Sequence, residues 1–69
     1  MEKTLIVKGM MCEHCEAHVK SALEKVDGVI SAKADRNKDE AVVVLSKEVP
    51  FETLKAAVEA ADYKVIGEK

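Results

Sequence analysis

The sequence is poor in aromatic residues, with one phenylalanine, one tyrosine and no tryptophan among its 69 residues. Its apolar residues are mostly valine, alanine and leucine, which favour a thin hydrophobic core. A chain of this length buries roughly 60% of its unfolded surface, so we expect one small domain over residues 1–69. Such a core leaves no room for a deep substrate cleft, and the composition therefore argues against an enzyme.

The chain also lacks an excess of basic charge and any long apolar segment. Thirteen acidic residues outnumber eleven basic ones, and the formal net charge of −2 argues against nucleic acid as a partner. No apolar run approaches the roughly 18 residues of a membrane span. The first ten residues, MEKTLIVKGM, lack the cleavage site of a secretory signal. We therefore expect a soluble, cytoplasmic protein without membrane insertion.

The spacing of apolar residues predicts six elements in the order βαββαβ. Short β-branched or alternating runs indicate strands, and apolar residues at every third or fourth position indicate helices. The predicted elements are a strand over 3–9, a helix over 14–26, a hairpin over 29–46, a helix over 51–61 and a strand over 63–67. This order predicts an α+β fold, the ferredoxin-like sandwich, with a four-stranded antiparallel sheet and both helices on one face.

Local signals mark the ends of these elements. The first helix should stop at Gly28, because glycine readily adopts the left-handed backbone conformation found there. Pro50 suits the start of the second helix. In the first strand of the hairpin, Ile30, Ala32 and Ala34 alternate with polar residues, so we expect these three side chains on one side of that strand.

Both cysteines of the chain stand in the segment GMMCEHC, residues 9–15. The predicted order places Cys12 in the loop after the first strand and Cys15 near the start of a helix, where the helix dipole favours a thiolate. In the cytoplasm such a pair is more typical of a metal site or a redox couple than of a structural disulfide. Two thiolates suit a two-coordinate soft ion such as Cu(I), whereas a structural zinc site normally has four ligands.

The segment GMMCEHC after a first strand, in a βαββαβ chain of this length, resembles the heavy-metal-associated domain family over essentially the whole chain. That family comprises small copper chaperones and metal-binding modules of metal-transporting P-type ATPases, with mercury-binding proteins as relatives. The histidine before the second cysteine, together with Tyr63, resembles the bacterial copper chaperones most. The resemblance implies that Cys12 and Cys15 bind Cu(I) on an exposed loop and pass it to a similar domain by ligand exchange.

The resemblance also assigns places to residues around the cysteines. It implies that Met10 points inward and holds the shape of the loop, and that Tyr63 lies beside the loop with its hydroxyl near the sulfurs. Met11 and His14 are most simply exposed side chains, and each is also a candidate for an additional weak ligand. Asp62 stands where the family usually has glycine, at a left-handed position that aspartate tolerates, so we expect a small stability cost.

Other functions fit part of the pattern. A thiol–disulfide oxidoreductase carries CxxC at a helix start, but this chain is short and no aromatic residue precedes the motif. A zinc carrier would add His14 or His18 to Cys12 and Cys15, and Hg(II) suits two thiolates in linear geometry. The fourth alternative is a metal-binding module of a P-type ATPase, although the absence of a linker around the outer strands favours a free-standing chaperone.

The resemblance finally implies partners and an assembly state. The expected partner is a copper-transporting P-type ATPase or a copper-responsive repressor, which would dock on the surface around the cysteines. Without metal we expect a monomer. At high copper, two exposed dithiolate loops would share several ions, which predicts a copper-bridged dimer.

Overall fold

Six elements follow one another along the chain in the predicted order βαββαβ, in a computed structural model that describes all residues 1–69. The structure confirms the type of every element. Both helices end two residues earlier than the sequence pattern predicts, because the last apolar residues of each pattern lie in the turn that follows. The elements are β1 (Glu2–Lys8), α1 (Glu13–Glu24), β2 (Val29–Asp35), β3 (Glu40–Leu45), α2 (Phe51–Glu59) and β4 (Lys64–Glu68).

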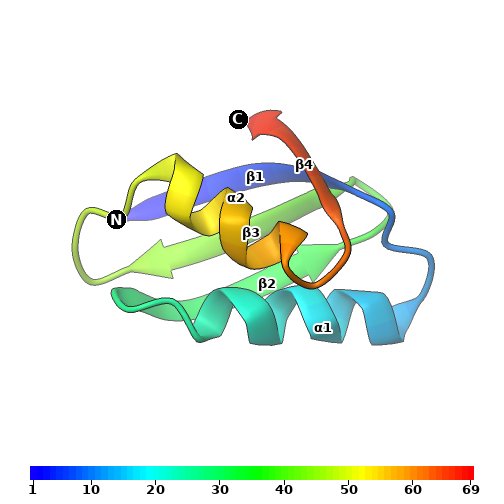
Figure 1. The fold of residues 1–69 in the computed structure, drawn as a ribbon, viewed down its shortest axis with the longest axis horizontal. Coiled ribbons are helices and arrows are strands. Elements are labelled where there is room, and N and C mark those ends of the chain that lie inside the picture. The colour runs from blue at the N-terminus through cyan, green and yellow to red at the C-terminus, as the bar shows by residue number, and fades with distance from the viewer.

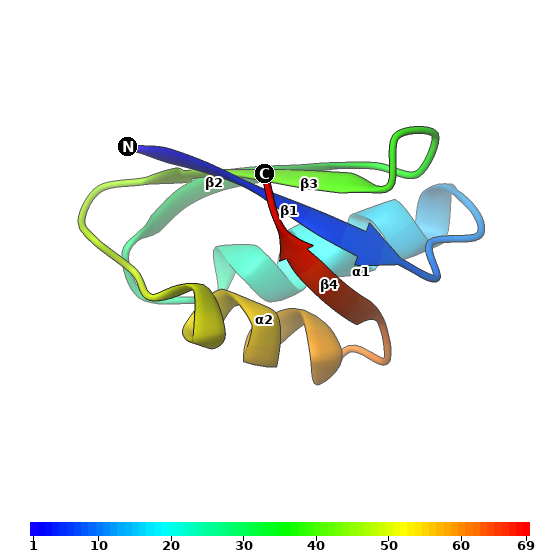
Figure 2. The same cartoon turned by 90° about the horizontal axis from the view of Figure 1, so that it is seen from above.

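The four strands form one sheet in the order β2-β3-β1-β4, and each neighbouring pair is antiparallel. Both helices lie on the same side of this sheet, as the ribbon in Figure 1 and the rotated view in Figure 2 show. The arrangement confirms the predicted ferredoxin-like sandwich. Neither helix has the combined length and apolar composition that crossing a bilayer requires.

The core fills the space between the sheet and the two helices. Strand β1 contributes Leu5 and Val7, which alternate with outward side chains as the period of a strand requires. Helices α1 and α2 each contribute two fully enclosed residues spaced four apart, one turn along a single face. The buried residues are Leu5, Val7, Met10, Val19, Leu23, Ala32, Ala41, Val43, Leu45, Val49, Leu54, Val58 and Val65. All of them are apolar, so hydrophobic burial without any buried charge stabilises the fold.

The alternation in β2 is broken at Ile30, and the prediction for this residue is wrong. Between Val29 and Ser31 the pairing register shifts, so that β2 advances by two residues while β3 advances by one. The additional residue of such a bulge reverses the alternation of side chains that follow it. Ile30 is consequently 63% exposed, whereas Ala32 is buried and Ala34 is half-buried. The predicted grouping holds for the two alanines only.

The turn between α2 and β4 contains the departure from the family pattern noted above. Asp62 has a φ of +71°, in the left-handed region where a side chain is strained and glycine is not. We predict that Asp62→Gly raises the free energy of unfolding by about 0.5–1 kcal/mol, since left-handed backbone costs roughly 1–2 kcal/mol for ordinary residues and less for aspartate. Urea denaturation measures this change. Asp62→Ala serves as the matched control and should be destabilised, and a loss of stability in Asp62→Gly would contradict the interpretation.

Candidate metal centre

The loop between β1 and α1, residues 9–12, carries the first cysteine and is anchored at its base. Gly9 has a φ of +99°, a conformation that lets the chain leave β1 in a tight turn. The side chain of Met10 is only 6% exposed and packs in the core, while Met11 is 84% exposed. The inward position expected of Met10 is therefore present. Burial of Met10 pins the loop to the core and leaves the following residues on the surface.

The two cysteines face each other across the first turn of α1. Cys12 is the N-cap residue, with extended backbone, and its carbonyl accepts hydrogen bonds from the N–H groups of Cys15 at 3.0 Å and Glu16 at 3.2 Å. The Cys12 thiol donates to the sulfur of Cys15 across 3.9 Å, and both cysteines are free. A disulfide requires sulfurs about 2.05 Å apart, so this is a reduced pair. Two metal–thiolate bonds of about 2.3 Å span such a separation with little movement.

The environment of Cys15 favours its thiolate form. A hydrogen bond from the Tyr63 hydroxyl is the largest influence, followed by one from the backbone of Met11, and together they lower the pKa of Cys15 to about 7. Partial burial opposes this shift, while backbone and side-chain hydrogen bonds from Cys12 add to it. Near neutral pH a large fraction of Cys15 is consequently ionised, and the thiolate is the form that binds metal.

Tyr63 keeps its proton at any physiological pH. Its hydrogen bond to Cys15 and its partial burial raise the pKa of the Tyr63 hydroxyl to about 12. The ring also lies beside the base of the loop, since a β-carbon added to Gly9 would be 3.7 Å from the Tyr63 Cδ1 atom. Tyr63 therefore lies beside the cysteine loop with a protonated hydroxyl, in the place that the resemblance to the family implies.

Two ion pairs connect this end of the molecule to the turn between β2 and β3. The Lys8 ammonium lies 2.8 Å from the Asp39 carboxylate. Glu16 accepts hydrogen bonds from the backbone N–H of Arg36 at 2.7 Å and from its guanidinium at 3.2 Å. The contacts of Glu16 hold the start of α1 against the hairpin, whereas the pair of Lys8 and Asp39 connects the end of β1 to it. Sequence reasoning missed both, because the partners stand 20 or more residues apart and share no local pattern.

The structure brings no third ligand to the two sulfurs. No group of three or more histidine, cysteine, aspartate or glutamate side chains is arranged to hold a metal ion. His18 points its Nδ1 atom at the Tyr63 hydroxyl, 3.3 Å away, and His14 is exposed to solvent. The zinc set of Cys12, Cys15 and His18 considered above is therefore not assembled. What remains is a two-sulfur site open to solvent.

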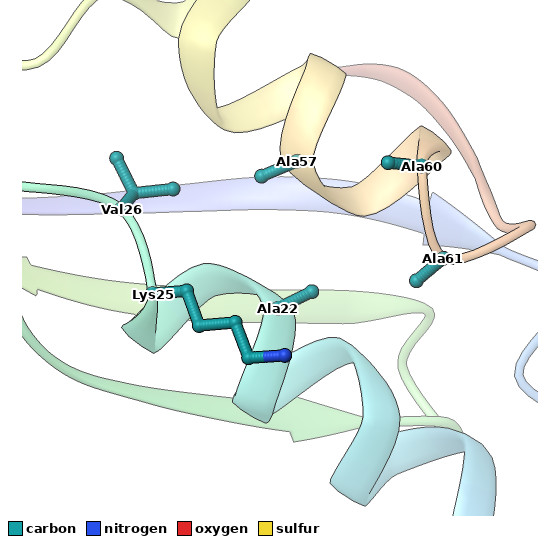
Figure 3. A pocket seen from close by; sticks show the side chains of 6 residues that line it. All are labelled: Ala22, Lys25, Val26, Ala57, Ala60 and Ala61. Atoms are coloured by element: carbon teal, nitrogen blue, oxygen red, sulfur yellow. The ribbon is translucent and has the colours of Figure 1, made fainter.

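The one groove of the molecule lies elsewhere. It has a volume of about 400 Å³ and opens between α1 and α2, as Figure 3 shows. Its lining contains no cysteine, histidine or carboxylate and consists of Ala22, Lys25, Val26, Ala57, Ala60 and Ala61. The groove therefore offers no side chain that ligates a soft metal ion, and the cysteine loop is the candidate functional site.

The family of the chain follows from comparison with known proteins. Residues 4–64, nearly the whole chain, match the model of the heavy-metal-associated domain. The chain belongs to the heavy-metal-associated domain family. The copper chaperone CopZ of Staphylococcus epidermidis is 40% identical over 65 residues, which are 93% of this chain and 96% of that protein. The mercuric reductase of Acidithiobacillus ferrooxidans is 46% identical over 61 residues, which are 88% of this chain but 11% of the reductase.

Solved structures of heavy-metal-associated domains superpose closely on this chain. A CopZ metallochaperone has a TM-score of 0.89 and 34% identity, and the match covers 96% of this chain and all of that one. A copper-binding domain of HMA7, a P-type ATPase, has a TM-score of 0.86 and 30% identity, and the match covers 99% of this chain and 96% of that one. The fold is thus that of the family.

The lowered pKa of Cys15 predicts a pH dependence of stability. An acid whose pKa falls on folding, here from 9.0 to about 7, stabilises the folded state fully above pH 9.0 and loses that contribution as pH falls towards 7. The urea midpoint of the reduced, metal-free protein should therefore rise between pH 7 and 9 relative to that of Cys15→Ser. Absorbance of the thiolate, followed over the same range, reports the pKa directly. If the urea midpoints of the two proteins changed equally between pH 7 and 9, the lowered pKa of Cys15 would be contradicted.

Proposed function

We propose that this chain is a metallochaperone that carries copper as Cu(I) on Cys12 and Cys15 and delivers it to a partner domain. The observation that most strongly supports this proposal is the pair of free sulfurs, which lie 3.9 Å apart on an exposed loop without a third ligand from the chain. The 40% identity to a copper chaperone over almost the full length of both proteins supports copper as the cargo. Cu(I) is soft and accepts two thiolates, and reduced cysteines fit a cytoplasmic setting.

The open geometry explains how the ion can be held tightly and still be released. Two thiolates satisfy Cu(I) with low coordination, and the exposed loop leaves one side of the ion accessible. A thiolate of the partner adds to the ion and forms a three-coordinate intermediate with sulfurs of both proteins. One cysteine of this chain then leaves, and the second exchange completes transfer without free ion in solution. The Tyr63 hydroxyl and the backbone N–H groups of the loop stabilise the departing Cys15 as a thiolate.

The partner in this proposal is a metal-binding domain of a copper-transporting P-type ATPase. Its support is the likeness to a copper-binding domain of such an ATPase, which has the same fold at 30% identity. Two domains of one fold with similar loops can share sulfurs symmetrically during exchange. A copper-responsive repressor as a second partner and a copper-bridged dimer at high copper follow from the same exposed loop, and both belong to the proposal.

A mercury carrier is the alternative, and the 46% identity to the matched segment of a mercuric reductase is the observation behind it. The match to a copper chaperone over almost its full length favours copper over mercury. Hg(II) accepts two thiolates as Cu(I) does. That segment makes up only 11% of the reductase, so the similarity gives no reason to assign the reductase activity to this chain. Zinc is disfavoured, because a structural zinc site uses four ligands and the loop offers two.

An anaerobic titration tests the proposed function. Cu(I) is added to the reduced protein in the presence of bathocuproine disulfonate, and gel filtration follows each ratio. We expect saturation at one copper per chain in competition with the chelator, and a shift to dimer above that ratio. Failure to compete with the chelator would overturn the copper proposal, and the same titration with Hg(II) would then test the second candidate.

A further inference from the structure

The cysteine segment GMMCEHC is attached at both of its ends to a single turn of the molecule. Lys8 directly precedes the segment, and its ammonium lies 2.8 Å from the Asp39 carboxylate. Glu16 directly follows the segment and accepts hydrogen bonds from the backbone N–H of Arg36 at 2.7 Å and from its guanidinium at 3.2 Å. Both partners belong to the hairpin turn between β2 and β3, residues 36–39, which lies at the same end of the molecule as the segment (Figure 1, Figure 2).

The hairpin turn is held in shape by hydrogen bonds of its own. The Asp35 carboxylate accepts bonds from the backbone N–H groups of Asn37 at 2.9 Å and Lys38 at 3.3 Å. Such a bond from an aspartate to the backbone two residues on orders a turn locally. The Asp39 carbonyl accepts a further bond, at 2.8 Å, from the backbone N–H of Val7 in β1, which joins the turn to the sheet. The cysteine segment is therefore attached to an ordered support.

The start of α1 depends on such a support, because its N-cap residue makes no capping contact. The side chain of Cys12 forms no hydrogen bond to the first turn of the helix. Serine, threonine, aspartate or asparagine at this position would satisfy one of the free backbone N–H groups. The ends of a helix open at little cost in free energy. Cys15 lies in this turn, and its N–H donates to the Cys12 carbonyl at 3.0 Å while the turn is formed.

We propose that Lys8 and Glu16 are positioning residues, which hold both ends of the cysteine segment against the hairpin turn and keep the first turn of α1 formed. The separation of the two sulfurs, 3.9 Å, is then set before the metal arrives. A single exposed ion pair stabilises little, but two contacts at the ends of one short segment restrict it together. The inference rests on the proposed function, because Cys12 and Cys15 are the proposed copper ligands.

Amide hydrogen exchange of the reduced, metal-free protein tests whether the two contacts keep the first turn formed. The reporter is the Cys15 N–H, and the buried Leu23 near the other end of α1 is the internal reference. In the double variant Lys8→Ala/Glu16→Ala we expect Cys15 to exchange at close to the rate of an unstructured amide, while Leu23 keeps its protection. Unchanged protection of Cys15 in this variant would overturn the proposal.

The matched control is the double variant Glu13→Ala/Lys64→Ala, which removes the same two residue types. Both side chains are exposed and neither takes part in an ion pair, so its exchange should be that of the wild type. Glu16→Gln loses the same charge as Glu16→Ala, but its amide oxygen can still accept the backbone N–H of Arg36. We therefore expect Glu16→Gln to retain more protection. A loss of protection that is equal throughout α1, or equal in the control, would contradict a positioning role.

Competition for Cu(I) with bathocuproine disulfonate tests whether the contacts serve metal binding. In Lys8→Ala/Glu16→Ala the affinity should fall about fivefold, because only molecules with a formed first turn present both sulfurs. The control variant should stay within about twofold of the wild type. An unchanged affinity in the double variant would overturn the positioning role. If the wild type itself bound no Cu(I), the proposed function would fail, whereas the exchange measurement would still decide whether the two contacts hold the turn.

Discussion

Replacing either Cys12 or Cys15 with serine is expected to lower the affinity for Cu(I) by at least about a thousandfold. The structure supplies two sulfurs and no third ligand, so each substitution leaves a single thiolate to hold the ion. Loss of an outer partner of a metal ligand already costs about 10–100-fold in affinity, and loss of one of two direct ligands costs more. Serine cannot compensate, because its hydroxyl is a hard donor that remains protonated at neutral pH.

Competition with bathocuproine disulfonate under anaerobic conditions measures this loss for each variant. Met11→Ala and His14→Ala are the matched controls in the same loop, because both side chains are exposed. We expect the two control variants to retain Cu(I) within about threefold of the wild type, which is less than 1 kcal/mol of binding free energy. A serine variant that competes with the chelator as well as the wild type would contradict the two-sulfur site.

Replacing Leu54 with alanine should lower the free energy of unfolding by about 3–4 kcal/mol. Leu54 lies on the inner face of α2 and is fully buried among the residues of the core. Large-to-small substitutions at such positions cost about 2.7–5 kcal/mol, because apolar contacts are lost and a cavity remains. A domain of this length has an unfolding free energy on the order of 3–10 kcal/mol, so this single change removes a large part of it.

Ile30→Ala provides the matched control, since it truncates a side chain of similar size that is 63% exposed. Its unfolding free energy should stay within about 0.5 kcal/mol of the wild type. Urea denaturation of both variants gives the comparison. If Ile30→Ala were as destabilised as Leu54→Ala, the bulge in β2 would be absent in solution and the original alternation would be correct.

The Ile30 comparison also illustrates which parts of the fold a sequence of this kind predicts. The type of each element depends on the local periodicity of apolar residues, which is clear in both helices and in most strands. The left-handed backbone at Asp62 was likewise predicted from the family pattern and is present at φ +71°. The exposure of Ile30 was not predictable, because it depends on how β2 registers against β3, a property of two segments and not of one.

In the candidate site, too, local features were predictable from the sequence and contacts between distant residues were not. The loop position of Cys12, the helical position of Cys15 and the burial of Met10 follow from short-range features of GMMCEHC and from the resemblance of the chain to its family. The contacts that fix the surroundings of the sulfurs connect residues far apart in the chain. The pair of Glu16 and Arg36 spans 20 positions and the contact of His18 with Tyr63 spans 45, so neither leaves a local signal.

The central claim, that the chain hands Cu(I) to a similar domain, is tested most directly by a transfer measurement. Copper-loaded, nitrogen-15-labelled protein is mixed anaerobically with an unlabelled metal-binding domain of a copper-transporting P-type ATPase, and NMR spectra of the loop from Met10 to Cys15 are recorded. We predict that these signals return to their metal-free positions on mixing, even with a chelator present to trap released copper. The partner with serines in place of its CxxC cysteines should leave the signals unchanged. Loop signals that stay in the copper-loaded position with the intact partner, or copper that reaches the chelator first, would contradict the claim.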